Sequence, residues 1–148
     1  MPRKSRPDLG ELERRLGHAF KDRKLLERAL THVSAIAAKG ARVDSYQRLE
    51  FLGDRVLGLA VSDMLHASFP KAAEGELSRR LAELVRKETC AEIASEWGVG
   101  DHLRLGGGEA QAGGAKKVAI LGDVCESLIG AVYVDAGFEA ARDLVRRN

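Results

Sequence analysis

The chain has 148 residues, of which 45% are hydrophobic and 31% are charged, the size and composition of one ordinary globular domain. A domain of this length buries enough surface to fold without a disulfide or a structural metal. The longest apolar stretch, residues 128–134, is too short to cross a membrane, and the basic N-terminus lacks the apolar segment of a secretory signal. We therefore expect a cytoplasmic protein that does not span a membrane.

Cysteine spacing and charge distribution narrow the possible partners. Cys90 and Cys125 lack the Cys-x-x-Cys or Cys/His spacing of a zinc site, which predicts buried free thiols. The net charge is +2, but residues 1–28 contain nine Lys/Arg against five Asp/Glu, and residues 142–148 contain three Arg and one Asp. Basic ends suit a phosphate-rich partner, and solvated helix faces explain them almost as well.

Apolar residues recur at helical spacing through most of the chain, and no segment shows sustained strand-like alternation, so we predict an all-α domain. Residues 8–16 and 24–30 predict two short helices, the first capped by Asp8. The longest predicted helix covers residues 45–68, and its broad apolar face indicates a central, heavily buried position. Pro70 ends it, because proline has no amide N–H to continue a helix.

The second half of the chain predicts two more pairs of helices. Residues 74–86 and 88–97 form two amphipathic segments. Residues 106–114 contain five glycines, which predicts a mobile surface loop without regular structure. Residues 116–136 and 138–147 predict the last two helices.

Four carboxylates lie on helix faces that should otherwise be apolar. Glu50 and Asp54 are four residues apart on the longest predicted helix. Asp123 and Glu126 are three residues apart on the penultimate one. Each pair therefore projects from one side of its helix. If the two helices pack with these faces together, mutual repulsion raises the carboxyl pKa values unless a cation lies among them.

A divalent cation would relieve this repulsion. Oxygen ligands without His or Cys favour a hard ion, Mg²⁺ or Mn²⁺. Glycines within the same helices are unfavourable by about 1 kcal/mol each relative to alanine, and we expect them to permit close helix approach or ligand access. These glycines are Gly53, Gly58, Gly122 and Gly130. The alternative is that the acidic pairs face solvent or pair with Arg48, Arg55, Lys116 and Lys117, and spacing alone does not decide between the two.

One segment closely resembles the signature of the ribonuclease III catalytic domain: residues 47–57, Gln-Arg-Leu-Glu-Phe-Leu-Gly-Asp-Arg-Val-Leu. Further segments are similar to motifs of that family and occur in the same order. They are Thr31-His-Val-Ser34, Glu74-Gly75 with Leu77-Ser78, residues 103–109 and residues 120–130. The resemblance implies that residues 1–148 are an all-α ribonuclease III catalytic domain that forms a two-fold dimer.

The same resemblance implies a metal-dependent endoribonuclease. It would hydrolyse double-stranded RNA to 5′-phosphate and 3′-hydroxyl ends, in the processing of ribosomal and other RNAs. Mg²⁺, or Mn²⁺ as a substitute, would activate a water and stabilise the leaving oxygen. The resemblance assigns the metal site to Glu50, Asp54, Asp123 and Glu126, with Asp54 and Glu126 as catalytic residues.

A homodimer follows from the same resemblance, because one such site cuts one strand and two sites related by a two-fold axis cut both. The contact is expected at Phe51 and Leu52, where the family pairs its subunits. Further active-site or RNA contacts are expected at Gln47, Glu74, His32, Ser34, Lys116 and Lys117. Gln47 stands where glutamate is commoner in the family. Duplex RNA would be bound through its phosphates and 2′-hydroxyls.

Bacterial members of the family usually continue into a double-stranded RNA-binding domain, which these 148 residues lack. We therefore expect weak RNA binding that depends steeply on salt. Two alternatives stand beside the endonuclease: a non-catalytic double-stranded RNA-binding or dimerisation module of the same fold, and a helical interaction protein whose acidic pairs are solvated. The presence of all four carboxylates, and of several motifs in order, favours the endonuclease.

Overall fold

The computed structural model describes residues 8–36 and 42–148. Within these ranges it contains helices and no strand, with one isolated parallel bridge between Thr31 and Arg104, which confirms the all-α prediction. The helices are α1 (Leu9–Leu16), α2 (Arg23–Ala29), α3 (Gln47–Ser68), α4 (Glu74–Leu84), α5 (Lys87–Glu96), α6 (Gly107–Gln111), α7 (Val118–Ala136) and α8 (Phe138–Arg147). Short 3-10 turns are η1 (Val33–Ala35), η2 (Arg42–Asp44), η3 (Val99–His102) and η4 (Gly114–Lys116). None of the described helices is both long and apolar enough to cross a membrane.

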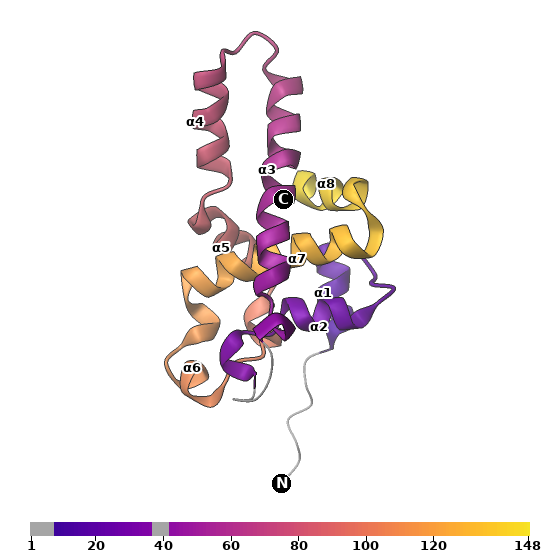
Figure 1. Cartoon of the computed structure of the whole chain (residues 1–148), viewed down its shortest axis with the longest axis vertical. Coiled ribbons are helices and arrows are strands. Elements are labelled where there is room, and N and C mark those ends of the chain that lie inside the picture. The colour runs from indigo at the N-terminus through magenta and orange to yellow at the C-terminus, as the bar shows by residue number, and fades with distance from the viewer. Residues whose placement is uncertain (1–7, 37–41) are drawn as a thin grey trace.

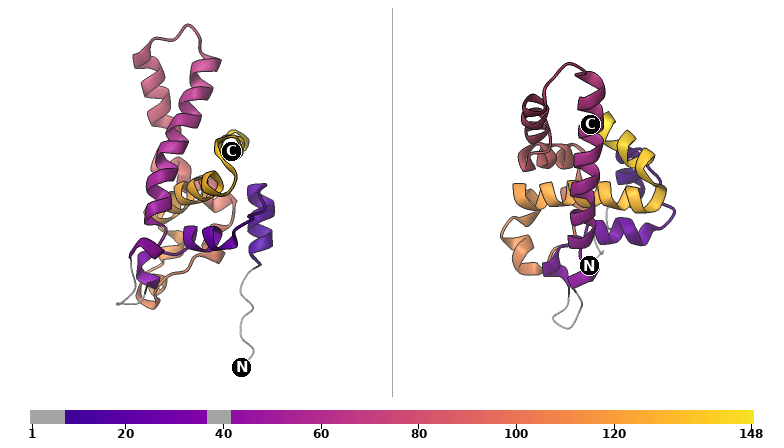
Figure 2. Two further views of the ribbon diagram at one scale, coloured as in Figure 1. Left: turned by 45° about the vertical axis from the view of Figure 1, so that its right-hand side comes forward. Right: turned by 45° about the horizontal axis from the view of Figure 1, so that its top comes forward.

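Helix α7 lies at the centre of the fold. Every residue from Ile120 to Val132 except Asp123 is buried, because α3, α5, α8 and α2 pack around this helix. Figures 1 and 2 show α3 crossing α7 at a steep angle, while α8 folds back beside it. Both cysteines are buried free thiols, as predicted.

The prediction of a central, heavily buried helix over residues 45–68 holds for only one face of α3. Helix α3 buries one face, whereas Phe51 and Leu59 on other faces are 63% and 58% exposed. Beyond the crossing, one face of α3 stays in the core as far as Leu65, and the end of the helix forms a hairpin with α4 that projects from the body (Figure 1). The apolar residues of this helix therefore include both core residues and exposed ones, and their spacing in the sequence does not distinguish the two groups.

Two glycines bring the backbones of α3 and α7 into direct contact. A Cβ on Gly53 would lie 1.7 Å from the Glu126 carbonyl oxygen, and one on Gly130 would lie 2.2 Å from the Leu49 carbonyl oxygen. The close approach predicted for these two positions is confirmed. Gly58 differs, since nothing lies within 4 Å of its Cβ position.

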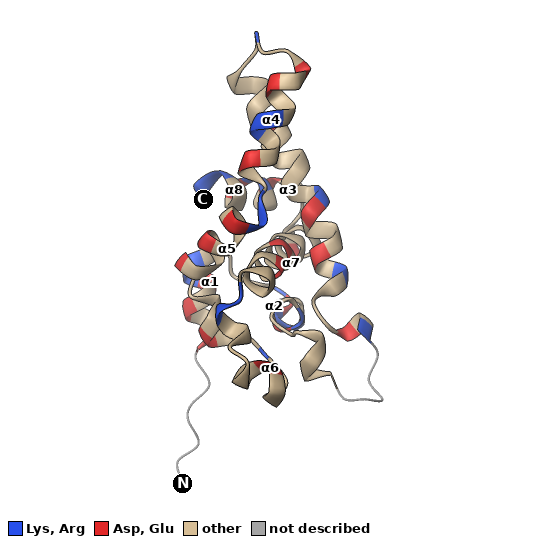
Figure 3. Ribbon diagram, turned by 90° about the vertical axis from the view of Figure 1, so that its left-hand side faces the viewer, with Lys and Arg blue, Asp and Glu red and all other residues tan. Residues whose placement is uncertain are grey.

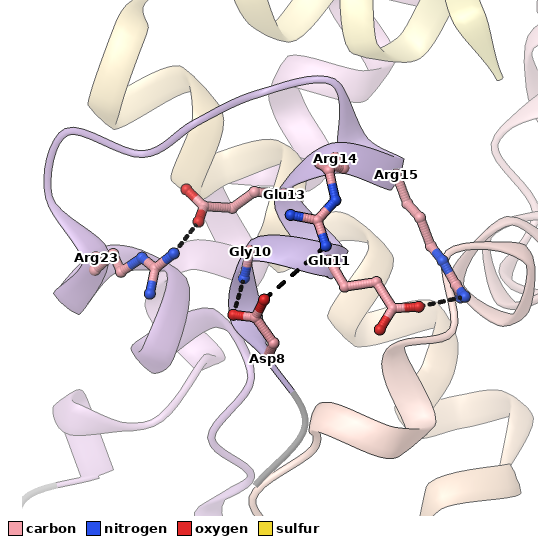
Figure 4. A network of polar contacts seen from close by, with 7 residues as sticks. All are labelled: Asp8, Gly10, Glu11, Glu13, Arg14, Arg15 and Arg23. Atoms are coloured by element: carbon pink, nitrogen blue, oxygen red, sulfur yellow. Dashed lines mark hydrogen bonds and ion pairs between the residues drawn. The ribbon is translucent and has the colours of Figure 1, made fainter.

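The basic N-terminal region is held by local ion pairs. Asp8 caps α1 as predicted, accepting a 2.9 Å hydrogen bond from the Gly10 amide. Arg15 pairs with Glu11 at 2.9 Å and Arg23 with the buried Glu13 at 2.6 Å, as Figure 4 shows. These pairs favour the structural explanation for the described part of the basic stretch.

The glycine-rich segment contains more regular structure than predicted. It forms the short helix α6 and then turn η4. The Gly106 amide donates to the Ser34 hydroxyl at 2.9 Å, and Lys117 pairs with Glu109 at 2.6 Å. These contacts hold both ends of a segment whose glycine content alone predicts a loop.

Candidate active site

The crossing of α3 and α7 brings the two predicted carboxylate pairs together. Glu50, Asp54 and Glu126 line one open pocket of about 370 Å³. Asp123 lies beside them, since Lys87, which also lines this pocket, forms an ion pair with it. The Gly53 contact sets this geometry, because it presses the face of α3 that carries Glu50 and Asp54 against α7.

The four side chains differ in their access to solvent. Glu126 is 7% exposed, whereas the Asp54 side chain is 53% exposed. Glu50 and Asp123 are partly buried. The pocket therefore has a buried acidic wall on α7 and a solvated acidic edge on α3. Figure 3 shows acidic positions on both helices among the surrounding basic ones.

Burial and mutual repulsion raise two of the carboxyl pKa values. Burial, followed by the charge of Asp123, raises the pKa of Glu50 from 4.5 to about 7. Burial, followed by the charge of Asp54, raises the pKa of Glu126 from 4.5 to about 7. Both shifts follow the direction expected from converging carboxylates, because each negative charge disfavours ionisation of its neighbours.

Two residues that the sequence motifs did not single out hold Asp123. The buried Tyr46 hydroxyl donates to one Asp123 oxygen at 3.2 Å, and the Lys87 ammonium forms an ion pair with the other. Burial, then Asp123, raises the pKa of the Tyr46 phenol well above its usual range, so the hydroxyl keeps its proton. Tyr46 immediately precedes the signature segment. Lys87 lies on α5, and none of the sequence motifs near it indicates a contact with Asp123.

The sequence left open whether the four carboxylates form ion pairs with nearby basic residues, and one such ion pair is present. Arg55 pairs with Asp54 at 3.3 Å. Arg48 lines a different, largely apolar pocket beside Phe51. Lys117 pairs with Glu109, so only Arg55 of these basic residues is seen to neutralise a carboxylate of the pocket.

The donor set fits a hard divalent ion in its chemistry. Carboxylate oxygens converge from two helices, and two of these carboxyls have the raised pKa values of an under-compensated acidic cluster. Within the described residues, however, no three His, Cys, Asp or Glu side chains are close enough to hold one ion. Ion binding would therefore require these side chains to draw together.

Of the other residues predicted to contact RNA or the active site, some line the carboxylate pocket and others lie outside it. Gln47 lines it. His32 and Ser34 bond to each other at 2.7 Å, and the His32 ring packs edge-on against Tyr46 with centroids 5.8 Å apart, so these residues support Tyr46. Lys116 lines a separate pocket with Asp101.

Glu74 is the first residue of α4. It lies at the far end of the hairpin that α3 and α4 form away from α7 (Figure 1). A single chain does not bring this side chain to the carboxylate pocket.

The family is decided by comparison with known proteins. A model described as Ribonuclease-III-like matches residues 22–148. The chain belongs to the ribonuclease III family. It is 61% identical over 140 residues to Ribonuclease 3 of Azorhizobium caulinodans, covering 95% of this chain and 60% of that protein. It is 62% identical over 139 residues to Ribonuclease 3 of Methylocella silvestris, covering 94% and 57%. This ribonuclease III chain thus spans well under two thirds of these curated relatives.

Solved structures of the ribonuclease III family share the fold. The nuclease domain of ribonuclease III from Campylobacter jejuni has a TM-score of 0.88 and 41% identity, with 95% of this chain and 94% of that chain covered. Dicer from Pichia stipitis has a TM-score of 0.63 and 27% identity, with 86% and 53% covered. The match to the nuclease domain covers nearly the whole of both chains.

Proposed function

We propose that this chain is the nuclease domain of a metal-dependent endoribonuclease that hydrolyses double-stranded RNA. The observation that carries the proposal is the convergence of Glu50, Asp54, Asp123 and Glu126 where α3 crosses α7. Family membership supports it, because the relatives named Ribonuclease 3 match this chain over most of its length. Processing of ribosomal and other RNAs in the cytoplasm is the setting that this activity implies.

The four carboxylates would hold Mg²⁺, with Mn²⁺ as a substitute. When bound, such an ion polarises the scissile phosphate, lowers the pKa of an attacking water and stabilises the leaving oxygen. Asp54, on the solvated edge, and Glu126, on the buried wall, face the space where that phosphate would enter. Tyr46 holds Asp123 in orientation by donating its hydroxyl proton.

The chemistry of the proposed cut balances without a side-chain nucleophile. Water adds its oxygen to phosphorus as the bond to the 3′ oxygen breaks. The departing 3′ oxygen takes up a proton, so the products are a 5′-phosphate and a 3′-hydroxyl.

Cutting both strands of a duplex requires two sites, and we propose that a homodimer supplies them. Phe51 is 63% exposed on α3, beside a pocket of about 600 Å³ lined by Leu25, Leu49, Leu52 and Val134 among others. An exposed apolar side chain next to an apolar pocket suits a two-fold contact, because each subunit presents both features to the other. The Campylobacter jejuni nuclease domain has a region involved in dimer formation.

The test is cleavage of a long RNA duplex at low salt with Mg²⁺ or with EDTA, using single-stranded RNA as the control. We expect metal-dependent cutting of the duplex alone. Glu126→Gln should lower the rate by more than about 100-fold, because even groups that merely support a metal ligand contribute 10–100-fold. The variant should fold and dimerise normally.

The non-catalytic alternative makes a different prediction for the same assay. A folded dimer that binds the duplex but does not cut it at any Mg²⁺ concentration would contradict the nuclease proposal. That result would support a double-stranded RNA-binding module instead. A protein that neither binds duplex RNA nor cuts it would favour the helical interaction protein.

A further inference from the structure

Lys87 occupies a specific position over the carboxylate pocket. It is the first residue of α5, and its ammonium pairs with Asp123. A Cβ on Gly122 would lie 2.8 Å from Lys87 Cγ and 3.1 Å from its Cε. The missing side chain of Gly122 therefore makes room for the Lys87 stem, which lies across α7 and reaches Asp123.

Lys87 is the main positive charge that balances the four carboxylates of the pocket. In the part of the chain that the structure describes, the four carboxylates form two ion pairs, Lys87 with Asp123 and Arg55 with Asp54. Arg55 also lies over the Phe51 ring, 3.9 Å from its centroid. Lys87, by contrast, offsets through its charge part of the rise in the pKa of both Glu50 and Glu126. One ammonium thus stabilises three of the four carboxylates.

Two cations cannot share one carboxylate without repelling each other. The Lys87 side chain is 42% exposed, and its flexible stem allows the ammonium to move into solvent. Resting on the proposed metal-dependent function, we propose that Lys87 is a built-in counter-cation that holds the metal-free carboxylate cluster and must release Asp123 when a divalent ion binds. Lys87 then lowers metal affinity while stabilising the protein before metal enters.

The test measures Mn²⁺ binding and thermal unfolding, not cleavage. Lys87→Met keeps an apolar stem over Gly122 and removes the charge. Near pH 8, where proton competition is small, isothermal titration calorimetry should show Mn²⁺ binding about three- to fivefold tighter than in wild type, the upper part of the range measured for exposed ion pairs. The metal-free variant should melt several degrees lower, and saturating Mn²⁺ should remove that difference.

Arg86→Met is the matched control. Arg86 precedes Lys87, and its substitution removes the same positive charge. Arg86 pairs with Glu88 at 3.5 Å, outside the pocket. Its Mn²⁺ affinity should stay within twofold of wild type. An equal gain in both variants would show a general charge effect and overturn the role assigned to Lys87. Unchanged or weaker Mn²⁺ binding in Lys87→Met would overturn it as well.

The same titrations separate failure of this inference from failure of the proposed function. Wild type should bind Mn²⁺, and Glu126→Gln should lose that binding. If wild type itself binds no Mn²⁺, the metal-dependent function fails and the inference fails with it. If wild type binds Mn²⁺ in a Glu126-dependent way and Lys87→Met binds no more tightly, only the inference fails.

Discussion

Two carboxyl groups of this protein respond to burial in opposite ways. The Asp135 side chain is 2% exposed, yet it accepts hydrogen bonds from the Lys21 and Asp22 amides, both at 3.0 Å, and pairs with His18 at 2.8 Å. Burial alone would raise the pKa of Asp135, but these partners hold it below its ordinary value. Glu126 is buried among other carboxylates, and its pKa rises to about 7. Partners, more than depth, decide which form of the group is stable.

The raised pKa values predict how stability depends on pH. Glu50 and Glu126 titrate at about 7 in the folded protein against an ordinary 4.5, so the folded state binds protons more tightly. Their contribution is fully present below about pH 4.5 and is lost as the pH rises through about 7. Chemical denaturation in EDTA between pH 5 and pH 8 should show this loss.

Glu126→Gln isolates one of the two groups. At pH 8 without metal, the variant should be more stable than wild type by on the order of 2 kcal/mol, because it avoids an ionised buried carboxylate. The difference should shrink as the pH falls and vanish below about pH 4.5. Glu83→Gln, at an exposed position on α4, is the control and should change little. A gain for Glu126→Gln that is the same at every pH would indicate packing, not charge, as its cause.

At the scale of elements, the contact between α3 and α7 is made by backbone. Gly53→Ala places a methyl group 1.7 Å from the Glu126 carbonyl oxygen, so the helices must separate. We expect the free energy of unfolding to fall by at least about 2 kcal/mol. Gly58→Ala, on the same helix but facing open space, should raise it by about 1 kcal/mol. Equal effects of the two substitutions in urea denaturation would contradict the close contact.

The helices and the acidic pairs could be predicted from sequence because both depend on local spacing. Glu50 and Asp54 share a face of any helix that contains them, whatever its neighbours. The contacts of Asp123 with Tyr46 and Lys87 could not be predicted, since they depend on where α5 packs over Gly122. Likewise, the order of the glycine-rich segment comes from Ser34, which lies 72 positions before Gly106.

At the scale of the whole molecule, the apolar surface around Phe51 predicts assembly. Phe51→Asp should weaken the proposed homodimer by at least about 30-fold, the effect of losing a central interface residue. Leu59→Asp is the matched control, because Leu59 is also exposed on α3 but does not line the pocket beside Phe51. Analytical ultracentrifugation would measure both. Dissociation by the two substitutions alike would place the interface elsewhere on α3.

The contact at Gly53 also divides α3 into a short segment and a long segment. Glu50 lies three residues on one side, about 4.5 Å along the axis, whereas Ser68 at the end of the helix lies fifteen residues on the other, about 22 Å away. The hairpin end of α3 is therefore about five times as far from this contact as the backbone at Glu50. The carboxylate pocket thus lies close to the point where the two backbones touch, and the hairpin tip lies far from it.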